Sequence, residues 1–261
     1  MFTNRALKSE YGHFYLSDST DVQECLEDES EADLHTHLAN CKKNPGHTEF
    51  IPVNEFSIMH LPDRYQDKIV YKLTKTMADI TVRIACNFTS PGRPEFVPGT
   101  KYPYPCYKTR GQKSLKTGTG GIRGVKHCVT DQTTNSHCPC PTCSNGSNTP
   151  REEWWCVKVI TVSHVVFDEE EARQSSCRLW FDDDESPMVT LSGLTICKSM
   201  SDLDWCSFYC VTHDKELADK IEKKLKAFYD VCLELRDKYR SLRDVDKLTI
   251  IVALVRLYQI L

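Results

Sequence analysis

The sequence predicts a mainly β protein with additional α-helix: a β-barrel of about six strands over residues 80–211, followed by one long amphipathic helix. Two observations support this fold class. Between residues 80 and 211, short apolar or alternating runs are separated by turn-forming residues, which is the pattern of antiparallel strands. From Asp214 to about Arg243, apolar residues recur at spacings of three and four, which is the pattern of an amphipathic helix.

The predicted elements follow one another along the chain. Apolar residues four positions apart predict a first helix from Pro62 to Ala78; they are Tyr65, Ile69, Leu73 and Met77. The runs with strand character after it are residues 81–86, 155–162, 177–181, 189–197 and 203–211. Asp214 is a favourable N-cap for the long helix, because its carboxylate can accept hydrogen bonds from the first free backbone N–H groups.

Three regions differ in composition. Residues 1–60 form an acidic arm, in which eight of the sixteen residues at positions 18–33 are acidic, and such a charge run predicts a solvated, disordered segment. Residues 61–213 hold the first helix and the barrel, with a Cys-rich insertion at 126–153. Residues 214–261 hold the long helix and a terminal apolar strand from position 247. An exposed strand this apolar predicts that residues 247–261 pair with a partner strand.

Composition and charge exclude several classes of protein. Hydrophobic residues make up 40% and charged residues 27% of the sequence, as in globular proteins. The net charge of −4 argues against a general nucleic-acid coat, and we expect no nucleic-acid partner although residues 96–130 are basic and contain tyrosines. The apolar run 248–261 is shorter than the roughly 18–20 residues that span a membrane. The N-terminus has no apolar signal segment, so we expect a cytoplasmic protein with reduced cysteines.

One histidine lies in a sequence context typical of a catalytic base. The segment Thr161-Val-Ser-His-Val-Val-Phe-Asp places His164 at the end of a predicted strand, before a short stretch rich in glutamate. It resembles the strand-to-helix turn that presents the general base in trypsin-like serine peptidases of the chymotrypsin fold (PA clan), especially those of the HtrA type. The run Thr117-Gly-Thr-Gly-Gly-Ile resembles the glycine-rich strand that opens that fold.

The same resemblance extends to an orienting aspartate. The segment Ser201-Asp-Leu-Asp-Trp-Cys-Ser-Phe is similar to the one that carries the aspartate of the catalytic triad in this family. The resemblance implies that His164 is the base and that Asp202 holds its imidazole in one tautomer. Asp204 is the alternative, because alternate residues of a strand share one face. Asp202 is preferred because a leucine follows it, as the family pattern requires.

The third member of the triad is missing from this pattern. The family places its nucleophile in a Gly-x-Ser-Gly turn, where the serine and the backbone N–H groups of the oxyanion hole share one loop. After Asp202 the sequence offers only Ser207 and Ser241, and it contains no glycine after Gly193. The resemblance therefore implies an incomplete trypsin-like barrel: a serine peptidase homologue that acts on or binds peptide or protein, and that is inactive or truncated in this form.

A cysteine cluster in the predicted insertion suggests a metal site. Cys138, Cys140 and Cys143 lie close together, and Cys140-Pro-Thr-Cys is a zinc half-site. Cys128 is predicted as the fourth ligand, with Cys156 as the alternative. Free thiols and disulfides remain alternatives to zinc. Such a zinc would be structural and not catalytic, because no open ligand position with a nearby base is evident in the sequence. The peptidase resemblance itself implies that no cofactor is required. The competing interpretation of the chain is therefore a non-enzymatic binding or scaffold module with a zinc-stapled loop.

Overall fold

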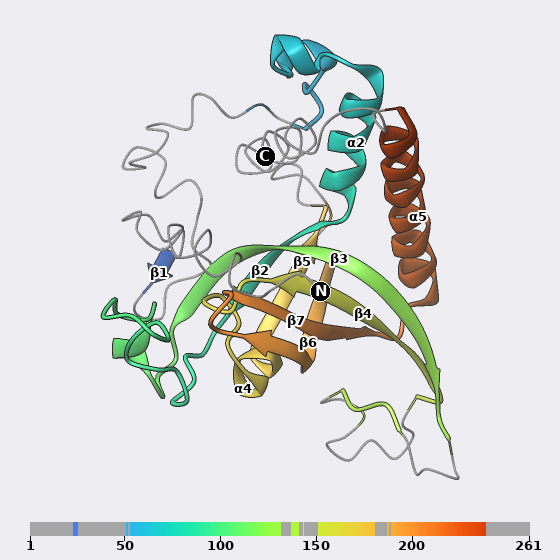
Figure 1. Cartoon of the computed structure of the whole chain (residues 1–261). Coiled ribbons are helices and arrows are strands. Elements are labelled where there is room, and N and C mark those ends of the chain that lie inside the picture. Colours follow the sequence, from blue (N-terminus) through green and yellow to red (C-terminus); the bar gives the residue numbers. More distant parts are fainter. Residues whose placement is uncertain are drawn as a thin grey trace, which may run out of the picture.

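An antiparallel sheet forms the body of the structure, with a pair of helices along one side of it and a short helix on the other (Figure 1). The computed structural model describes residues 23–25, 51, 53–131, 137–140, 143, 151–180, 187 and 189–238. The strands are β1 (Gln23–Cys25), β2 (Thr81–Cys86), β3 (Leu115–Val129), β4 (Glu153–Thr161), β5 (Ser175–Leu179), β6 (Val189–Met200) and β7 (Trp205–Thr212). The α-helices are α2 (Lys68–Asp79), α4 (Glu169–Arg173) and α5 (Lys215–Lys238).

The strands pair in the order β1-β3-β2-β5-β6-β7-β4, and β3 also pairs with β4. The first part of β3 pairs with β2 and its second part pairs with β4. Within the set of six strands from β2 to β7, each strand therefore has two antiparallel neighbours, so the series of pairs closes on itself. The prediction of a mainly β fold with a long helix is confirmed.

Alternating side chains of these strands build the core. In β2 every second residue is buried, and Val82 and Ile84 are at most 1% exposed. Val157 and Val159 of β4 and Phe208 of β7 are fully buried and belong to the same apolar cluster. This is the period of two that a strand with one face on a core requires.

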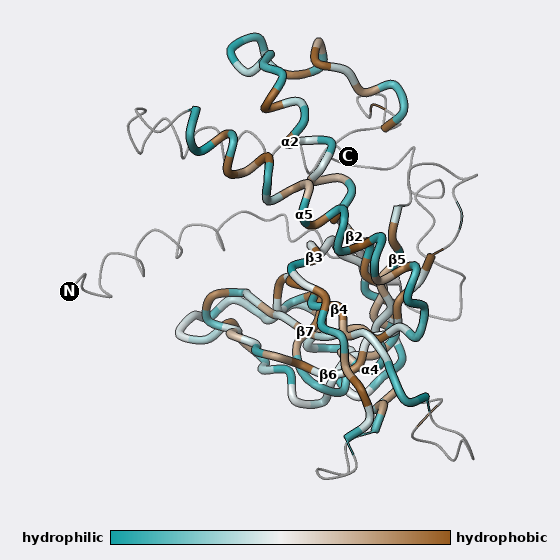
Figure 2. The backbone as a smooth tube through the Cα atoms, turned by 90° about the vertical axis from the view of Figure 1, so that its right-hand side faces the viewer, coloured by the Kyte–Doolittle hydropathy of each residue, from teal (hydrophilic) through white to brown (hydrophobic). Residues whose placement is uncertain are grey.

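The helices α2 and α5 pack against each other and extend the same core. Ile221, Leu225 and Phe228 of α5 join the apolar cluster with Val70 and Leu73 of α2. The backbone N–H of Leu217 donates to Asp214 Oδ1 at 3.0 Å, so Asp214 caps α5. Figure 2 shows hydrophobic and hydrophilic residues alternating along α5.

The first helix begins later than the sequence pattern predicted. It starts at Lys68 and not at Pro62, because Asp67 caps it through a hydrogen bond from the Ile69 N–H group at 2.8 Å. The residues before it form short 3₁₀ turns, Ile58–His60 and Asp63–Tyr65. A third 3₁₀ turn, Tyr107–Thr109, lies between β2 and β3.

Two glycines let neighbouring segments approach the sheet closely. A Cβ atom on Gly118 of β3 would lie 2.5 Å from Val165, in the segment that follows β4. A Cβ atom on Gly193 of β6 would lie 2.0 Å from the Ala172 carbonyl oxygen of α4. Both positions therefore hold the segment from His164 to α4 against the strands, because a larger residue would push that segment away.

Some predicted regions differ from the structure or lie outside the described residues. Residues 126–129, assigned to the Cys-rich insertion, belong to β3 and pair with residues 153–156 of β4. The predicted terminal strand at 247–261 and most of the N-terminal arm lie outside the described residues. Within that arm, β1 pairs with residues 115–117 of β3. Among the described helices, none combines the length and apolar character that a membrane span needs.

Candidate metal centre and histidine–aspartate pair

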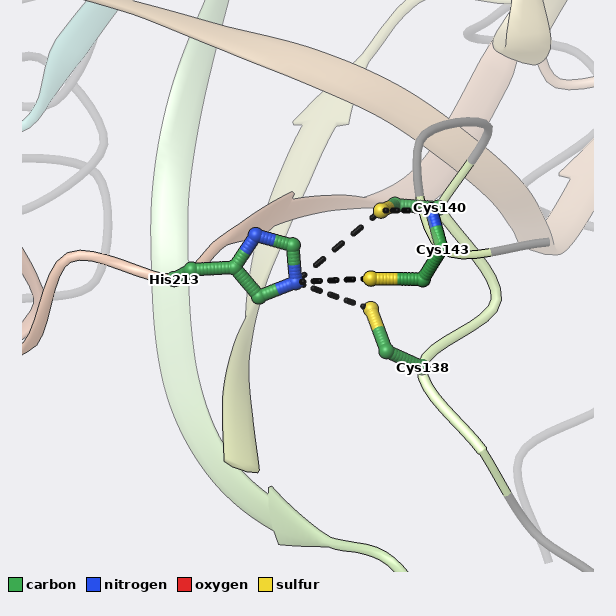
Figure 3. Close-up of side chains that lie close together, drawn as sticks. All are labelled: Cys138, Cys140, Cys143 and His213. Atoms are coloured by element: carbon green, nitrogen blue, oxygen red, sulfur yellow. Dashed lines mark hydrogen bonds between the residues drawn. The ribbon is translucent and has the colours of Figure 1, made fainter. Parts of the chain in front are cut away.

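Three cysteines and a histidine converge on one point beside the end of β7 (Figure 3). Cys138, Cys140 and Cys143 come from the segment between β3 and β4, and His213 directly follows β7. The four possible ligand atoms lie within 4.8 Å of one another. His213 Nε2 is 3.1 Å from the sulfur of Cys138, 3.9 Å from that of Cys140 and 3.7 Å from that of Cys143. The group could therefore hold a metal ion between these four atoms.

Burial shapes the acid–base properties of this group. Cys138 is 2% exposed, and burial raises the pKa of its thiol to about 12. Burial and the charge of Arg151 lower the pKa of His213, which favours the neutral imidazole that binds metals. A hydrogen bond from the Arg151 backbone lowers the pKa of Cys143. A cation among these groups would offset the cost of forming the Cys138 thiolate, which is the form that binds metal.

The fourth member of the group differs from the predicted ligand. Cys128 and its alternative Cys156 lie on the neighbouring strands β3 and β4, with their sulfurs 3.9 Å apart. They pack against a small buried cluster that includes Cys138 and Cys140, but they do not belong to the group of four possible metal ligands. His213 takes the fourth place because Thr212 pairs with Trp155 near the start of β4, where the Cys-rich segment ends. The pairing of β7 with β4 reveals this candidate ligand, since His213 is distant in sequence from the cysteines.

The structure also brings His164 and Asp204 together. His164 Nδ1 lies 2.6 Å from Asp204 Oδ2, and both side chains are mostly buried. Asp204 Oδ1 accepts two further hydrogen bonds, from the backbone N–H of His164 and from the hydroxyl of Ser163, both at 3.0 Å. His164 follows β4, and Asp204 ends the turn between β6 and β7.

Asp204 is held as a carboxylate. Burial alone would raise its pKa, but the hydrogen bonds and charge of His164 and the hydroxyl of Ser163 outweigh burial and lower its pKa below the usual 3.8. A carboxylate accepts hydrogen bonds and donates none, so His164 must donate its Nδ1–H to it. That tautomer leaves Nε2 with a lone pair on the opposite side of the ring, which is the arrangement of a general base.

Asp202, the preferred orienting residue, is exposed in the same turn, and its alternative Asp204 pairs with His164. Residues 201–204 form a turn, so the strand period of two that placed both aspartates on one face does not apply. Asp204 has a left-handed backbone, with φ at 46°. This conformation is tolerated by aspartate better than by most residues.

Comparison with protein-family models, with curated proteins and with solved structures finds no match for this chain.

Proposed function

We propose that this chain is a homologue of trypsin-like serine peptidases, in which His164 occupies the place of the general base and Asp204 the place of the residue that orients it. The observation that carries the proposal is the 2.6 Å contact between His164 Nδ1 and Asp204 Oδ2. The closed series of six antiparallel strands also supports the proposal, because the resemblance implies a six-stranded antiparallel barrel. The short helix α4 follows His164, as the resemblance predicts.

The geometry of the pair suits the chemistry of a triad. In such a triad the aspartate fixes the tautomer and orientation of the imidazole, and it stabilises the imidazolium that forms when a nucleophile gives up its proton. Asp204 meets these requirements because it is mostly buried, ionised and bound by three hydrogen bonds from residues 163–164. The substrate class that the proposal implies is a peptide or protein.

An orienter variant tests this proposal. Asp204→Asn should move the proton of the neutral imidazole of His164 from Nδ1 to Nε2, because the new amide can donate a hydrogen bond to Nδ1. Asp202→Asn is the matched control and should leave the tautomer unchanged, since Asp202 is exposed. The nitrogen chemical shifts of the histidine ring in ¹⁵N-labelled protein report the tautomer. An Nε2–H tautomer already present in the unaltered protein would contradict the proposal.

The 261-residue chain alone is expected to show no serine peptidase activity. No Gly-x-Ser-Gly turn occurs in its sequence, and Ser207 of β7 is fully buried. His164 and Asp204 can activate a nucleophile but cannot replace one. A fluorophosphonate probe should therefore leave the purified chain unlabelled. Stoichiometric labelling that His164→Ala removes would show that a working nucleophile exists in this chain.

We also propose that the group of Cys138, Cys140, Cys143 and His213 holds a structural zinc ion. Three thiolates and one imidazole are a common zinc ligand set, and four protein ligands leave no open position for catalysis. The ion would hold the segment between β3 and β4 against the end of β7.

The metal site also favours the second candidate function, a binding module in which the metal-held loop contacts a protein. Metal analysis of the purified chain should find one zinc per chain.

A further inference from the structure

The His164–Asp204 pair is connected to the loop between β2 and β3 through a buried tyrosine. Tyr104 is 3% exposed, and its hydroxyl lies 3.0 Å from the hydroxyl oxygen of Ser163. Ser163 is fully buried and donates in turn to Asp204 Oδ1 at 3.0 Å. The four residues Tyr104, Ser163, Asp204 and His164 therefore form one continuous series of hydrogen bonds, which we call the donor chain.

The direction of each hydrogen bond in the donor chain is determined by its members. The carboxylate of Asp204 has no proton to give, so the single proton of the Ser163 hydroxyl must point to it. Tyr104 must then be the donor to Ser163, because that serine has no second proton. Burial raises the pKa of Tyr104 to about 12, so its phenol is protonated at neutral pH.

The ring of Tyr104 is itself held in place by a buried ion pair. The guanidinium of Arg93 lies 5.7 Å from the centroids of the Tyr104 and Phe167 rings. Two of its nitrogens contact the two carboxylate oxygens of Glu171 at 2.6 Å each. Its third nitrogen donates to the carbonyl oxygens of His164 and Pro105, both at 3.0 Å. Arg93 therefore connects the loop that carries Tyr104 to the backbone of His164.

We propose that Tyr104 is a positioning residue for the His164–Asp204 pair and acts through the hydroxyl of Ser163. Buried hydrogen-bonded groups polarise one another, so the phenol strengthens the bond that Ser163 donates to the carboxylate. By donating to the oxygen of Ser163, the phenol also keeps the single proton of that hydroxyl directed at Asp204 Oδ1, while Oδ2 faces His164. This inference rests on the proposed role of His164 as a base, but the donor chain can be tested separately.

The test measures the proton affinity of Asp204 by following its ¹³C-labelled carboxyl carbon during acid titration of the full chain. Outside the donor chain, the charge of this carboxylate acts on the Cys206 thiol, and the charges of Arg93 and Glu171 act on the Tyr104 phenol. Ser163→Ala should raise the proton affinity of Asp204 about tenfold, because a hydrogen bond to the charged form is lost. Tyr104→Phe should raise it by a smaller factor, about threefold, because it only weakens that bond.

A double variant and a control make the result specific. If Tyr104 acts through Ser163, the variant with both Tyr104→Phe and Ser163→Ala should match Ser163→Ala alone. Thr74→Val is the matched control: its buried hydroxyl donates to the Val70 carbonyl at 3.0 Å on α2, away from the donor chain. It should leave the proton affinity of Asp204 unchanged. Tyr104→Phe retains the aromatic ring, so the loop should keep its packing against Arg93.

The outcomes separate the two proposals. An unchanged proton affinity of Asp204 in Tyr104→Phe would overturn the positioning role, even if the folded protein became less stable. Additive effects in the double variant would also overturn it, since Tyr104 would then act by another route. In contrast, an Nε2–H tautomer of His164 in the unaltered protein would overturn the proposed function and leave the donor chain to be judged by the titration alone.

Discussion

Cys138→Ser should abolish stoichiometric zinc binding. The serine hydroxyl is a poor zinc ligand, and three remaining ligands cannot close the tetrahedral site. We expect the affinity to fall by about 100-fold or more, since changes that only disturb the surroundings of a metal site already cost 10–100-fold. His213→Ala should have a similar effect, because His213 Nε2 is the atom on which the three sulfurs converge. Competition with a chromogenic chelator measures both affinities.

Cys128→Ser and Cys156→Ser are the matched controls for this experiment. Both cysteines pack beside the buried cluster that includes Cys138 and Cys140. Neither belongs to the group of four possible ligands, so zinc binding should be retained. Loss of zinc in Cys128→Ser with retention in His213→Ala would show that the ligand set is the one predicted from sequence. A purified chain without zinc, in which Cys138, Cys140 and Cys143 react freely with a thiol reagent, would contradict the metal site itself.

The elements that the sequence predicts well are those with local causes. The helix α5 has a cap at Asp214 and an apolar face at spacings of three and four, and both signals lie within the helix itself. The strand β2 shows its alternation within six residues. The same holds for Cys138, Cys140 and Cys143, whose proximity follows from their spacing in one short segment.

The features that the sequence missed or left open depend on how distant strands pair and on how a turn is shaped. His213 joins Cys138, Cys140 and Cys143 because β7 pairs with β4 in a register that places Thr212 opposite Trp155. Asp204 and Asp202 differ by two positions, and a turn with one left-handed residue decides which of them faces His164. Neither the register nor the turn conformation has a signal in the composition of these segments.

Charged residues were the least predictable part of the fold. Lys116 lies in the basic stretch 96–130, yet its side chain is fully buried. Its ammonium group lies 3.6 Å from Glu171 Oε1, which also pairs with Arg93. Charged residues are mostly exposed in proteins, and only a partner from another segment reverses that expectation. Here the partner is Glu171, which lies on α4, the short helix that follows His164.

Arg93→Met should destabilise the folded protein by about 3–5 kcal/mol, because it leaves a buried carboxylate without its main partner. Glu171 is fully buried, and its two oxygens receive both hydrogen bonds of the Arg93 fork at 2.6 Å. Arg173→Met is the matched control. Arg173 pairs with Glu169 at 3.0 Å on α4, the short helix that also carries Glu171, but the Arg173 side chain is 66% exposed. Loss of the Arg173 guanidinium should therefore cost less than about 1 kcal/mol. Urea unfolding monitored by tryptophan fluorescence measures both changes.

The cost of Arg93→Met should depend on pH in a direction that identifies its cause. In the intact protein, burial would raise the pKa of Glu171, but the hydrogen bonds and charge of Arg93 outweigh burial and lower that pKa below 4.5. The stability contributed by the ionised carboxylate is therefore complete above about pH 4.5 and is lost as the pH falls through the lower pKa of the folded state. In Arg93→Met burial prevails and raises the pKa of Glu171 above 4.5, so the folded variant binds a proton at a higher pH than the folded intact protein does. The difference in unfolding free energy should therefore shrink as the pH falls from 7 towards 4. A difference that stays constant from pH 7 to pH 4 would mean that Arg93 stabilises the fold by packing alone.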